Sequence, residues 1–409
     1  MERIVGRDNV VKALKRVEEN KGSPGIDGMT VQELRPWLNA HWPEVKASLL
    51  AGSYRPAAVR EQEIPKSGGG VRKLGIPTVL DRLIQQCILQ VLQPQFDPTF
   101  SEGSYGFRPG RSAHDAVRAA QRHIQSGRTW VVDVDLEKFF DRVNHDVLMG
   151  RLARRISDRR LLGLIRRYLT AGVMAGGVVM ERYEGTPQGG PLSPLLANVL
   201  LDEVDKELER RGLAFCRYAD DCNVYVGSRR AAMDAMETLK RLFTSLRLRV
   251  NESKSAVDRP WNRKFLGYSF WVAAGRKMKL RVAPQALEKM KERVREITRR
   301  TRGRSMMSVA AELRGFLNGW RNYFKLAQTP RVFADLDGWV RRRLRMLQLK
   351  QWKRGTTIYR ELRRLGATDS LAKMVAGNSG SWWRNAGKKV SIVLTAKYFD
   401  QLGVPRLAR

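Results

Sequence analysis

Two pairs of aspartates have the residue type and spacing that metal-dependent chemistry needs. One pair ends the segment YADD (218–221), which separates two apolar, strand-like stretches, so adjacent carboxylates are expected at a tight turn. The other pair, Asp133 and Asp135, lies two residues apart in the apolar run 129–136, which puts both on one face of a strand. Carboxylates that converge form an all-oxygen site suited to Mg²⁺, and two such ions can drive in-line phosphoryl transfer. Taken alone, YADD is more simply explained as a solvated turn, since aspartate is a favoured turn residue.

Two glycine-rich segments could contact a nucleotide. Lys66 and Arg72 flank a run of three glycines, which places two cations on a turn between strands; the alternative is an ordinary surface hairpin. The segment GTPQGGPLSP (185–194) holds too many Gly and Pro residues for an ordinary helix start. Either it places backbone amides against a nucleotide or it is only a long connection.

The elements that must position these residues alternate between strand and helix. The run 129–136 predicts a strand, with a helix from about 144 to 156. Residues 214–226 predict two short strands around a turn, and 231–246 a helix by apolar spacing. This alternation with an antiparallel hairpin favours an α+β, palm-like sheet. After Pro284 the pattern predicts three helices and then, past a break at 376–381, a short tail.

The charge of the chain indicates a polyanionic partner. Lys plus Arg number 76 against 41 Asp plus Glu, a formal net charge of +35. Residues 276–365 alone hold 26 basic and 7 acidic residues, a net +19, which is more than half of the excess. Nucleic acid is the favoured partner and an acidic membrane surface the second choice.

Other classes find little support in the composition. No apolar run approaches the 18 or so residues that a membrane-spanning helix needs, so no membrane partner is expected. The N-terminal MERIVGRDNV carries charge where a signal peptide would be apolar, which predicts a cytoplasmic protein. The three cysteines form no CxxC pair, so neither a zinc site nor a disulfide framework is expected.

Eight sequence blocks, in this order, resemble the reverse transcriptases encoded by group II introns, the intron maturases. They are PGIDGMT (24–30), PKSGGGVRKLGIP (65–77), SYGFRPGRSAHDA (104–116), VDLEKFFDRVNH (134–145), GTPQGGPLSPLLANVLLDEVD (185–205), RYADD (217–221), LRLRVNESKS (246–255) and KFLGY (264–268). The resemblance extends over essentially the whole chain and implies a right-hand polymerase, in which fingers and a palm with a ferredoxin-like βαββαβ core precede an all-helical thumb. The expected domains are an N-terminal extension and fingers interleaved with the palm (1–100), the palm (101–275), the helical thumb or maturase domain (276–365) and a reduced, DNA-binding-like tail (366–409).

The resemblance also implies roles for individual residues. The metal-binding, catalytic carboxylates are expected at Asp135, Asp220 and Asp221; the second aspartate of the strand pair is chosen because the family's ligand precedes a stretch that ends in Phe-Phe. Phe139 or Phe140 is expected beneath the incoming sugar, where a ring leaves no room for a 2′-hydroxyl.

The remaining expected sites concern the triphosphate, the primer and RNA. Lys66 and Arg72 would hold the triphosphate, the arginine through its forked geometry, and Lys254 would lie near the leaving phosphates. Three further groups are expected: Gln188 and Gly189 in the nucleotide pocket; Phe265, Leu266 and Gly267 in the primer-gripping turn; and Arg341, Arg342, Arg343, Arg345 and Lys350 on a basic, RNA-binding helix.

The function implied by the resemblance is RNA-directed DNA polymerisation with two Mg²⁺ ions, for which Mn²⁺ could substitute. Its partners would be a group II intron RNA whose splicing and mobility it assists, an RNA template with a DNA primer, deoxynucleoside triphosphates and target DNA; a homodimer is compatible with the sequence. A Cys/His-rich nuclease segment is lacking, which resembles the short class that takes its primer from a nick or fork made elsewhere. The alternatives are a domesticated, defence or repair-associated reverse transcriptase, and an RNA-binding splicing cofactor without polymerase activity.

Overall fold

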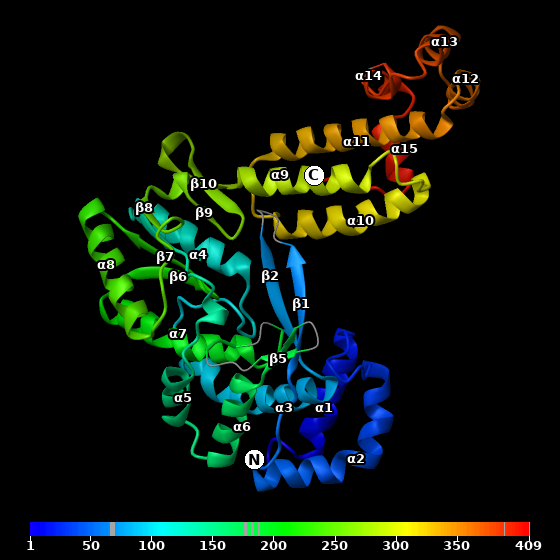
Figure 1. The fold of residues 1–409 in the computed structure, drawn as a ribbon. Helices are drawn as coiled ribbons and strands as arrows, with labels where there is room; N and C mark the ends of the chain where they lie inside the picture. The colour runs from blue at the N-terminus through cyan, green and yellow to red at the C-terminus, as the bar shows by residue number, and fades with distance from the viewer. Residues whose placement is uncertain (66–69, 176–177, 181–183, 187–188, 388, 409) are drawn as a thin grey trace. The chain divides into compact units, whose positions relative to one another are not determined.

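The computed structural model spans the 409 residues and describes all of them except 66–69, 176–177, 181–183, 187–188, 388 and 409. The chain forms two compact units, Met1–Pro260 and Trp261–Arg409 (Figure 1). The four-part division expected from the sequence is finer than these two units and stays a prediction.

The first unit begins with three helices that pack together: α1 (Arg7–Asn20), α2 (Val31–Ala51) and α3 (Val79–Phe96). The start of α2 is fixed by a capping box, in which the backbone amide of Thr30 donates to the Glu33 carboxylate at 2.7 Å. Asp81 in the first turn of α3 is buried and accepts hydrogen bonds from the hydroxyls of Tyr54 and Tyr168. A buried carboxylate satisfied in this way ties the helices to the segments on either side.

A four-stranded sheet of order β2-β1-β4-β5 lies next along the chain. Its strands are β1 (Val59–Pro65), β2 (Val71–Ile76), β4 (Val173–Ala175) and β5 (Val178–Met180). The hairpin of β1 and β2 is antiparallel, whereas β1 and β4 are parallel over two residue pairs.

The central sheet has the order β6-β7-β3-β8, with every neighbouring pair antiparallel. Its strands are β3 (Trp130–Val134), β6 (Ala214–Tyr218), β7 (Asp221–Val226) and β8 (Ala256–Asp258). Helices separate β3 from β6 and β7 from β8, while a tight turn joins β6 to β7. This is the βαββαβ connection with the strand order of a ferredoxin-like core, so the α+β class and the palm-like sheet predicted from the sequence are confirmed.

The helices of this unit are α4 (Ala113–Gln125), α5 (His145–Ala153), α6 (Arg159–Thr170), α7 (Ser193–Arg210) and α8 (Arg229–Ser245). The starts of four of them are capped by a side-chain oxygen, from Ser112, Asn144, Asp158 and Ser228 respectively for α4, α5, α6 and α8. Helix α7 contributes Leu196, Leu200 and Val204 to a core shared with β3, β7 and α3. The sheet that holds the aspartates is therefore anchored on its helical side.

The second unit begins with a small antiparallel sheet, β9 (Lys264–Phe265), β10 (Tyr268–Val272) and β11 (Met278–Val282), in the order β11-β10-β9. Three long helices follow, α9 (Pro284–Ile297), α10 (Met306–Tyr323) and α11 (Pro330–Trp352), with Pro284 at the first helical position as predicted. The tail folds into α12 (Gly355–Arg364), α13 (Asp369–Gly377), α14 (Trp382–Asn385) and α15 (Ala396–Gln401). The predicted break at 376–381 separates α13 from α14.

Candidate active site and nucleic-acid interface

The register of the central sheet brings the aspartates together. Within the β6–β7 hairpin Tyr218 pairs with Asp221, so Asp220 lies in the turn itself. On the other side of β7, Cys222 pairs with Val134 of β3. Asp135 directly follows Val134 and Asp221 directly precedes Cys222, so these two residues are neighbours across adjacent strands. Positions 135 and 221, which are 86 residues apart in sequence, thus meet at one end of the sheet.

The backbone of Asp135 is fixed by the loop after Val250. Its amide donates to the Ser255 hydroxyl at 3.0 Å, and its carbonyl accepts the Asn251 amide at 2.8 Å. The Lys254 ammonium lies 3.8 Å from the Asp135 carboxylate, so the expected phosphate-side lysine and the expected metal ligand are adjacent. Asp133 lies one pair farther from the turn, opposite Asn223 in the sheet register, and the choice of Asp135 as the ligand stays a prediction.

The donor set suits a hard divalent cation. Asp135, Asp220 and Asp221 offer only carboxylate oxygens, the ligands that Mg²⁺ takes from proteins. Among the residues that the structure describes, no three His, Cys, Asp or Glu side chains lie close enough together to hold a metal ion. The backbones are juxtaposed, and like-charged carboxylates repel one another unless a cation lies between them. The three residues fit the metal in donor type, and the sheet register places the backbones of Asp135 and Asp221 side by side.

A buried arginine holds the turn between β6 and β7. Arg217 is 1 % exposed and donates to both oxygens of Asp205 on α7, at 2.7 and 2.5 Å. It also donates to Asn198 at 3.0 Å, to the Ser104 hydroxyl at 2.8 Å and to the carbonyl of Ala219 at 2.9 Å. The last bond is made to the turn that precedes Asp220. Burial dominates the pKa of the Asp205 carboxyl and raises it, while the adjacent guanidinium acts in the opposite direction.

The segment 103–106 lies against the same turn. The backbone amide of Tyr105 donates to the carbonyl of Arg217, and the side-chain Nδ2 of Asn198 donates to the carbonyl of Gly106 at 2.9 Å. Ala219 has φ +58°, a left-handed conformation that is uncommon for a residue with a side chain. A Cβ at Gly106 would lie 2.2 Å from the Ala219 nitrogen, so only glycine fits there.

Sequence reasoning missed this support. Arg217, Asp205 and Asn198 all fall within the blocks that carry the resemblance, yet none was singled out. A signal was present, because Arg217 interrupts the apolar strand AFCRY, and Asp205 falls among the apolar positions Val204 and Leu208 of α7. A charged residue at a buried position needs a partner of opposite charge.

The two phenylalanines after Asp135 have different environments. Phe139 is 2 % exposed and belongs to the hydrophobic core, whereas Phe140 is partly exposed. Their rings meet edge to face at 5.1 Å. The carbonyl of Phe140 accepts the amide of Thr186 at 2.7 Å, which joins the GTPQGG segment to this turn. Of the two rings, that of Phe140 is the one with exposed surface.

The other nucleotide-side residues are described only in part. Gly189 has φ +136° and a Cβ there would lie 2.8 Å from the carbonyl oxygen of Gly75, so the segment passes close to β2. Lys66 and Gln188 lie outside the described residues. Arg72 is a residue of β2 opposite Ile64, and only its backbone is among the described parts of the chain.

The expected primer-gripping turn is a two-residue hairpin in the second unit. Leu266 and Gly267 have φ of +51° and +78°, as a turn with two left-handed residues requires, and they join β9 to β10. Phe265 is buried, and the carbonyl of Leu266 accepts the Tyr323 hydroxyl at 2.9 Å. The turn is thus anchored to α10.

The predicted RNA contact by Arg341 is wrong. This side chain is 2 % exposed, and its guanidinium donates to Asp400 at 2.9 Å and to the carbonyls of Val404 and Pro405, both at 3.1 Å. Arg341 lies on the buried face of the 23-residue helix α11. Its hydrogen bonds attach the C-terminal segment to this helix. Spacing along the helix could not reveal that a later segment covers it.

The other basic residues of α11 remain partly exposed. Arg345 donates to the carbonyl of Leu394 at 2.8 Å, Arg343 to the Thr298 hydroxyl at 2.7 Å, and Arg342 to the carbonyl of Trp383 at 3.4 Å. Lys350 is also partly exposed. RNA binding by Arg342, Arg343, Arg345 and Lys350 stays a prediction.

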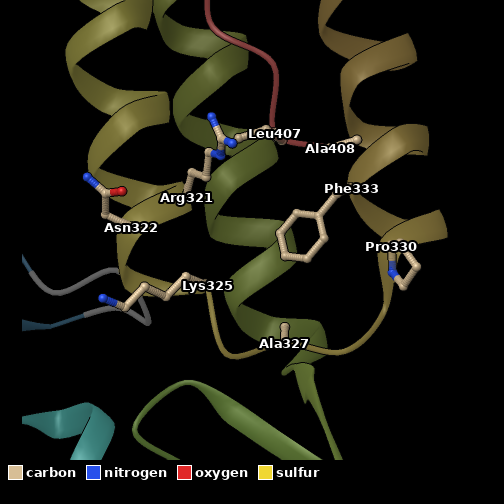
Figure 2. A pocket seen from close by; sticks show the side chains of 8 residues that line it. All are labelled: Arg321, Asn322, Lys325, Ala327, Pro330, Phe333, Leu407 and Ala408. Carbon is tan, nitrogen blue, oxygen red and sulfur yellow. The ribbon is translucent and has the colours of Figure 1, made fainter.

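A cavity of about 490 Å³ lies in the second unit, at the end of α10. Figure 2 shows Phe333 between the helices, with Arg321 directed toward Leu407 of the tail. Two backbone amides of the tail, those of Leu407 and Ala408, donate to Asp337 of α11 at 2.8–2.9 Å. The tail, attached to α11 in this way, therefore forms one wall of the cavity.

In the described parts of the chain, no helix is long and apolar enough to cross a membrane.

Comparisons with known proteins agree with the expected family. The family model "Reverse transcriptase (RNA-dependent DNA polymerase)" matches residues 64–270, about half of the chain, and "Group II intron, maturase-specific domain" matches residues 287–366. Protein YkfC of Escherichia coli (strain K12) is 34 % identical over 289 residues, which cover 61 % of this chain and 76 % of YkfC.

Two further relatives cover less of their own length. The group II intron-encoded protein LtrA of Lactococcus lactis subsp. cremoris is 40 % identical over 213 residues, 50 % of this chain and 34 % of LtrA. Among solved structures, a chain of a partial Cas6-RT-Cas1–Cas2 complex is 28 % identical with a TM-score of 0.37, covering 60 % of this chain and 42 % of the other. The two family models and the match to LtrA support the expected polymerase and maturase roles and do not favour the alternatives. The chain belongs to the reverse transcriptase (RNA-dependent DNA polymerase) family and contains a group II intron maturase-specific domain.

Proposed function

We propose that this protein is an active RNA-directed DNA polymerase, with Asp135, Asp220 and Asp221 as its metal-binding residues. The observation that carries the proposal is the register of β3 and β7, which makes Asp135 a neighbour of Asp221 at the hairpin turn. A protein that only bound RNA would gain nothing from adjacent carboxylates in a chain of net charge +35, since each would repel phosphate.

The chain's own residues would bind and orient the reacting groups. When bound, two divalent ions would activate the primer 3′-hydroxyl and stabilise the leaving pyrophosphate. Lys254, 3.8 Å from the Asp135 carboxylate, would offset negative charge on the phosphates or donate a proton. Arg217 would hold the turn so that Asp220 and Asp221 face the substrate in one geometry.

Selection of deoxynucleotides would be steric. Phe140 is the partly exposed ring of the Phe-Phe pair, and Phe139 packs beneath it in the core. A ring held from below cannot move aside for a 2′-hydroxyl, so ribonucleotides would be excluded by collision.

We also propose that the second unit binds a group II intron RNA and assists its splicing. The segment 276–365, net charge +19, contains the match to the maturase-specific domain. LtrA, which matches half of this chain, is itself an intron-encoded protein. Target DNA and a template–primer duplex are the further nucleic-acid partners of this proposal.

The polymerase proposal is tested by primer extension on an RNA template with Mg²⁺, with Mn²⁺ and with a chelator. Asp220→Asn removes one carboxylate at nearly constant volume and should lower extension at least about 100-fold, equivalent to about 2.7 kcal/mol of transition-state stabilisation. RNA affinity should change less than about twofold, because the turn is not part of the basic second unit.

The matched control is Asp234→Asn, the same substitution at an exposed position of α8. It should extend primers at the wild-type rate. Extension by Asp220→Asn at that rate would remove the residue from the metal site. A wild-type protein that binds RNA but extends no primer with either metal would leave only the splicing-cofactor role.

A further inference from the structure

Four arginines of the second unit lie over indole rings rather than beside carboxylates. Arg295 and Arg343 both approach Trp339, at 5.8 and 5.6 Å from the ring centre. Arg342 lies over Trp383 at 4.2 Å, and Arg300 over Trp382 at 5.5 Å. These distances fall within the range of cation–π attraction. We call the surface formed by Arg295, Arg300, Arg342, Arg343, Trp339, Trp382 and Trp383 the Arg–Trp face.

The Arg–Trp face joins three segments that are distant in sequence. It takes residues from the C-terminal half of α9, the turn after it, the middle of α11 and the short helix α14. Helix α14 packs against α11, and Figure 1 shows α9 running alongside α11. Trp382 and Trp383 therefore extend the surface beyond residues 287–366, where the maturase-specific domain matches.

Two other arginines of the second unit form ion pairs with carboxylates. Arg293 of α9 pairs with Glu296 at 2.8 Å and with Glu312 at 2.9 Å, and Arg304 also pairs with Glu312. For the four arginines of the Arg–Trp face, no ion pair with a carboxylate is found in the described part of the chain. The second unit thus contains arginines that pair with its own carboxylates, and the four arginines of the Arg–Trp face, whose charge is available to an anion from another molecule.

The uncompensated charge is concentrated enough to affect titration. Burial, followed by the positive charges of Arg295 and Arg300, lowers the pKa of Arg343. Crowded cations repel one another, so an anionic ligand bound to the four arginines would relieve this repulsion.

Trp383 gives the surface a second property. This side chain is 39 % exposed, with the guanidinium of Arg342 on its ring. An exposed indole whose cation is held in place offers a stacking surface for a base, and only an unpaired base can reach it. Phosphates alone would need no ring, and a continuous duplex would offer none of its base faces.

We propose that the Arg–Trp face binds an unpaired segment of a structured RNA, with phosphates on the four arginines and a base stacked on Trp383. This proposal rests on the proposed RNA-binding role of the second unit and names the site that performs it. It extends the predicted basic helix to α9 and α14 and removes Arg341 from it.

The test measures binding by fluorescence anisotropy as a function of KCl, with three probes of equal length: an RNA hairpin with an unpaired loop, a blunt RNA duplex and single-stranded DNA. Arg342→Gln with Arg343→Gln should weaken hairpin binding and reduce the slope of log K against log salt by roughly 0.7–0.9 for each lost phosphate contact. The control, Arg293→Gln with Arg304→Gln, removes the same charge from paired positions and should leave the slope unchanged.

The stacking contact is tested by Trp383→Ala with Trp383→Phe beside it. The alanine variant should weaken hairpin binding roughly 5- to 150-fold with the salt slope unchanged, the phenylalanine variant should retain most affinity, and duplex binding should hardly change. Equal losses for hairpin and duplex, or a slope that falls as much in the control pair, would overturn the proposal. So would single-stranded DNA that binds as tightly as the hairpin and responds to the same substitutions.

Primer extension on an annealed template, measured for the same variants, separates this proposal from the polymerase proposal. If the wild-type protein extends no primer but Trp383→Ala loses hairpin binding, only the polymerase proposal is refuted. If the double variant Arg342→Gln with Arg343→Gln and the variant Trp383→Ala both extend primers normally and bind the hairpin as the wild type does, only the proposal for the Arg–Trp face is refuted.

Discussion

Replacing Arg217 with lysine tests whether this side chain positions the β6–β7 turn, which we propose to be catalytic. The substitution keeps the positive charge opposite Asp205 but changes a five-donor fork into a single ammonium with three donors. Arg217 donates five hydrogen bonds to four partners, so the lysine must abandon at least two of them. The carbonyl of Ala219 is one of the farther acceptors, at 2.9 Å, and is among the bonds expected to be lost.

The magnitude follows from the number and kind of bonds lost. A neutral hydrogen bond contributes about 1 kcal/mol net and a charge-assisted one about 1.5–3 kcal/mol, so two lost bonds should lower the free energy of unfolding by roughly 2–4 kcal/mol. Removal of the charge, as in Arg217→Met, should cost more, about 3–5 kcal/mol, since Asp205 would be left buried without a cation. A turn displaced by about 1 Å should lower kcat on the order of 100-fold.

The assay is single-nucleotide extension at saturating template–primer, with Mg²⁺ varied, at a temperature where the variant is folded. Arg217→Lys should lower kcat and raise the Mg²⁺ concentration for half-maximal activity, while RNA affinity stays within about twofold. Arg210→Lys is the matched control, because Arg210 is exposed on the same helix as Asp205 and pairs with Glu207 at 2.7 Å, a surface pair of little energetic weight. A folded Arg217→Lys with wild-type kcat and Mg²⁺ dependence would refute the positioning role.

Three further perturbations have defined outcomes. Gly106→Ala brings a methyl group 2.2 Å from the Ala219 nitrogen and should lower kcat at least about 10-fold with RNA binding intact, as measured by the same extension assay. Phe140→Ala should increase ribonucleotide incorporation, whereas Phe139→Ala, in the core, should instead lower stability by about 3–5 kcal/mol; misincorporation and denaturant unfolding separate the two. The pKa of His123 is lowered, chiefly by burial and then by Arg128 and Arg122, so the folded state binds a proton less readily than the unfolded state. The free energy of unfolding should therefore fall as the pH drops below about 6.5. His123→Asn should reduce this pH dependence, as measured by denaturant unfolding between pH 7.5 and 5.

The sequence predicted those features that depend on local pattern. Period-two spacing around Asp133 and Asp135, and the turn between two apolar runs at 218–221, gave β3 and the β6–β7 hairpin at their observed places. Pro284 and the apolar spacing after it gave α9. In each case the same residues that determine the secondary structure are visible in a window of a few residues.

What the sequence could not give depends on which segments meet. Arg341 was assigned to RNA by its helical neighbours, but residues 400–405, some 60 positions later, cover it and accept its hydrogen bonds. The convergence of Asp135 with Asp221 came from the resemblance, since no local pattern states that β3 pairs with β7.

The same reasoning explains why Arg217 was missed and why it matters. An arginine in an apolar strand places a charge at a buried position, and a fold accommodates it only where groups from other segments pair with it. Here Asp205, Asn198 and Ser104 do so from two other segments, and the remaining donor reaches the carbonyl of Ala219. Each buried N–H of the guanidinium needs an acceptor, and the carbonyl of Ala219 is the acceptor that belongs to the turn. This bond connects the buried network to the turn before Asp220 and Asp221, the two residues that we propose as metal ligands.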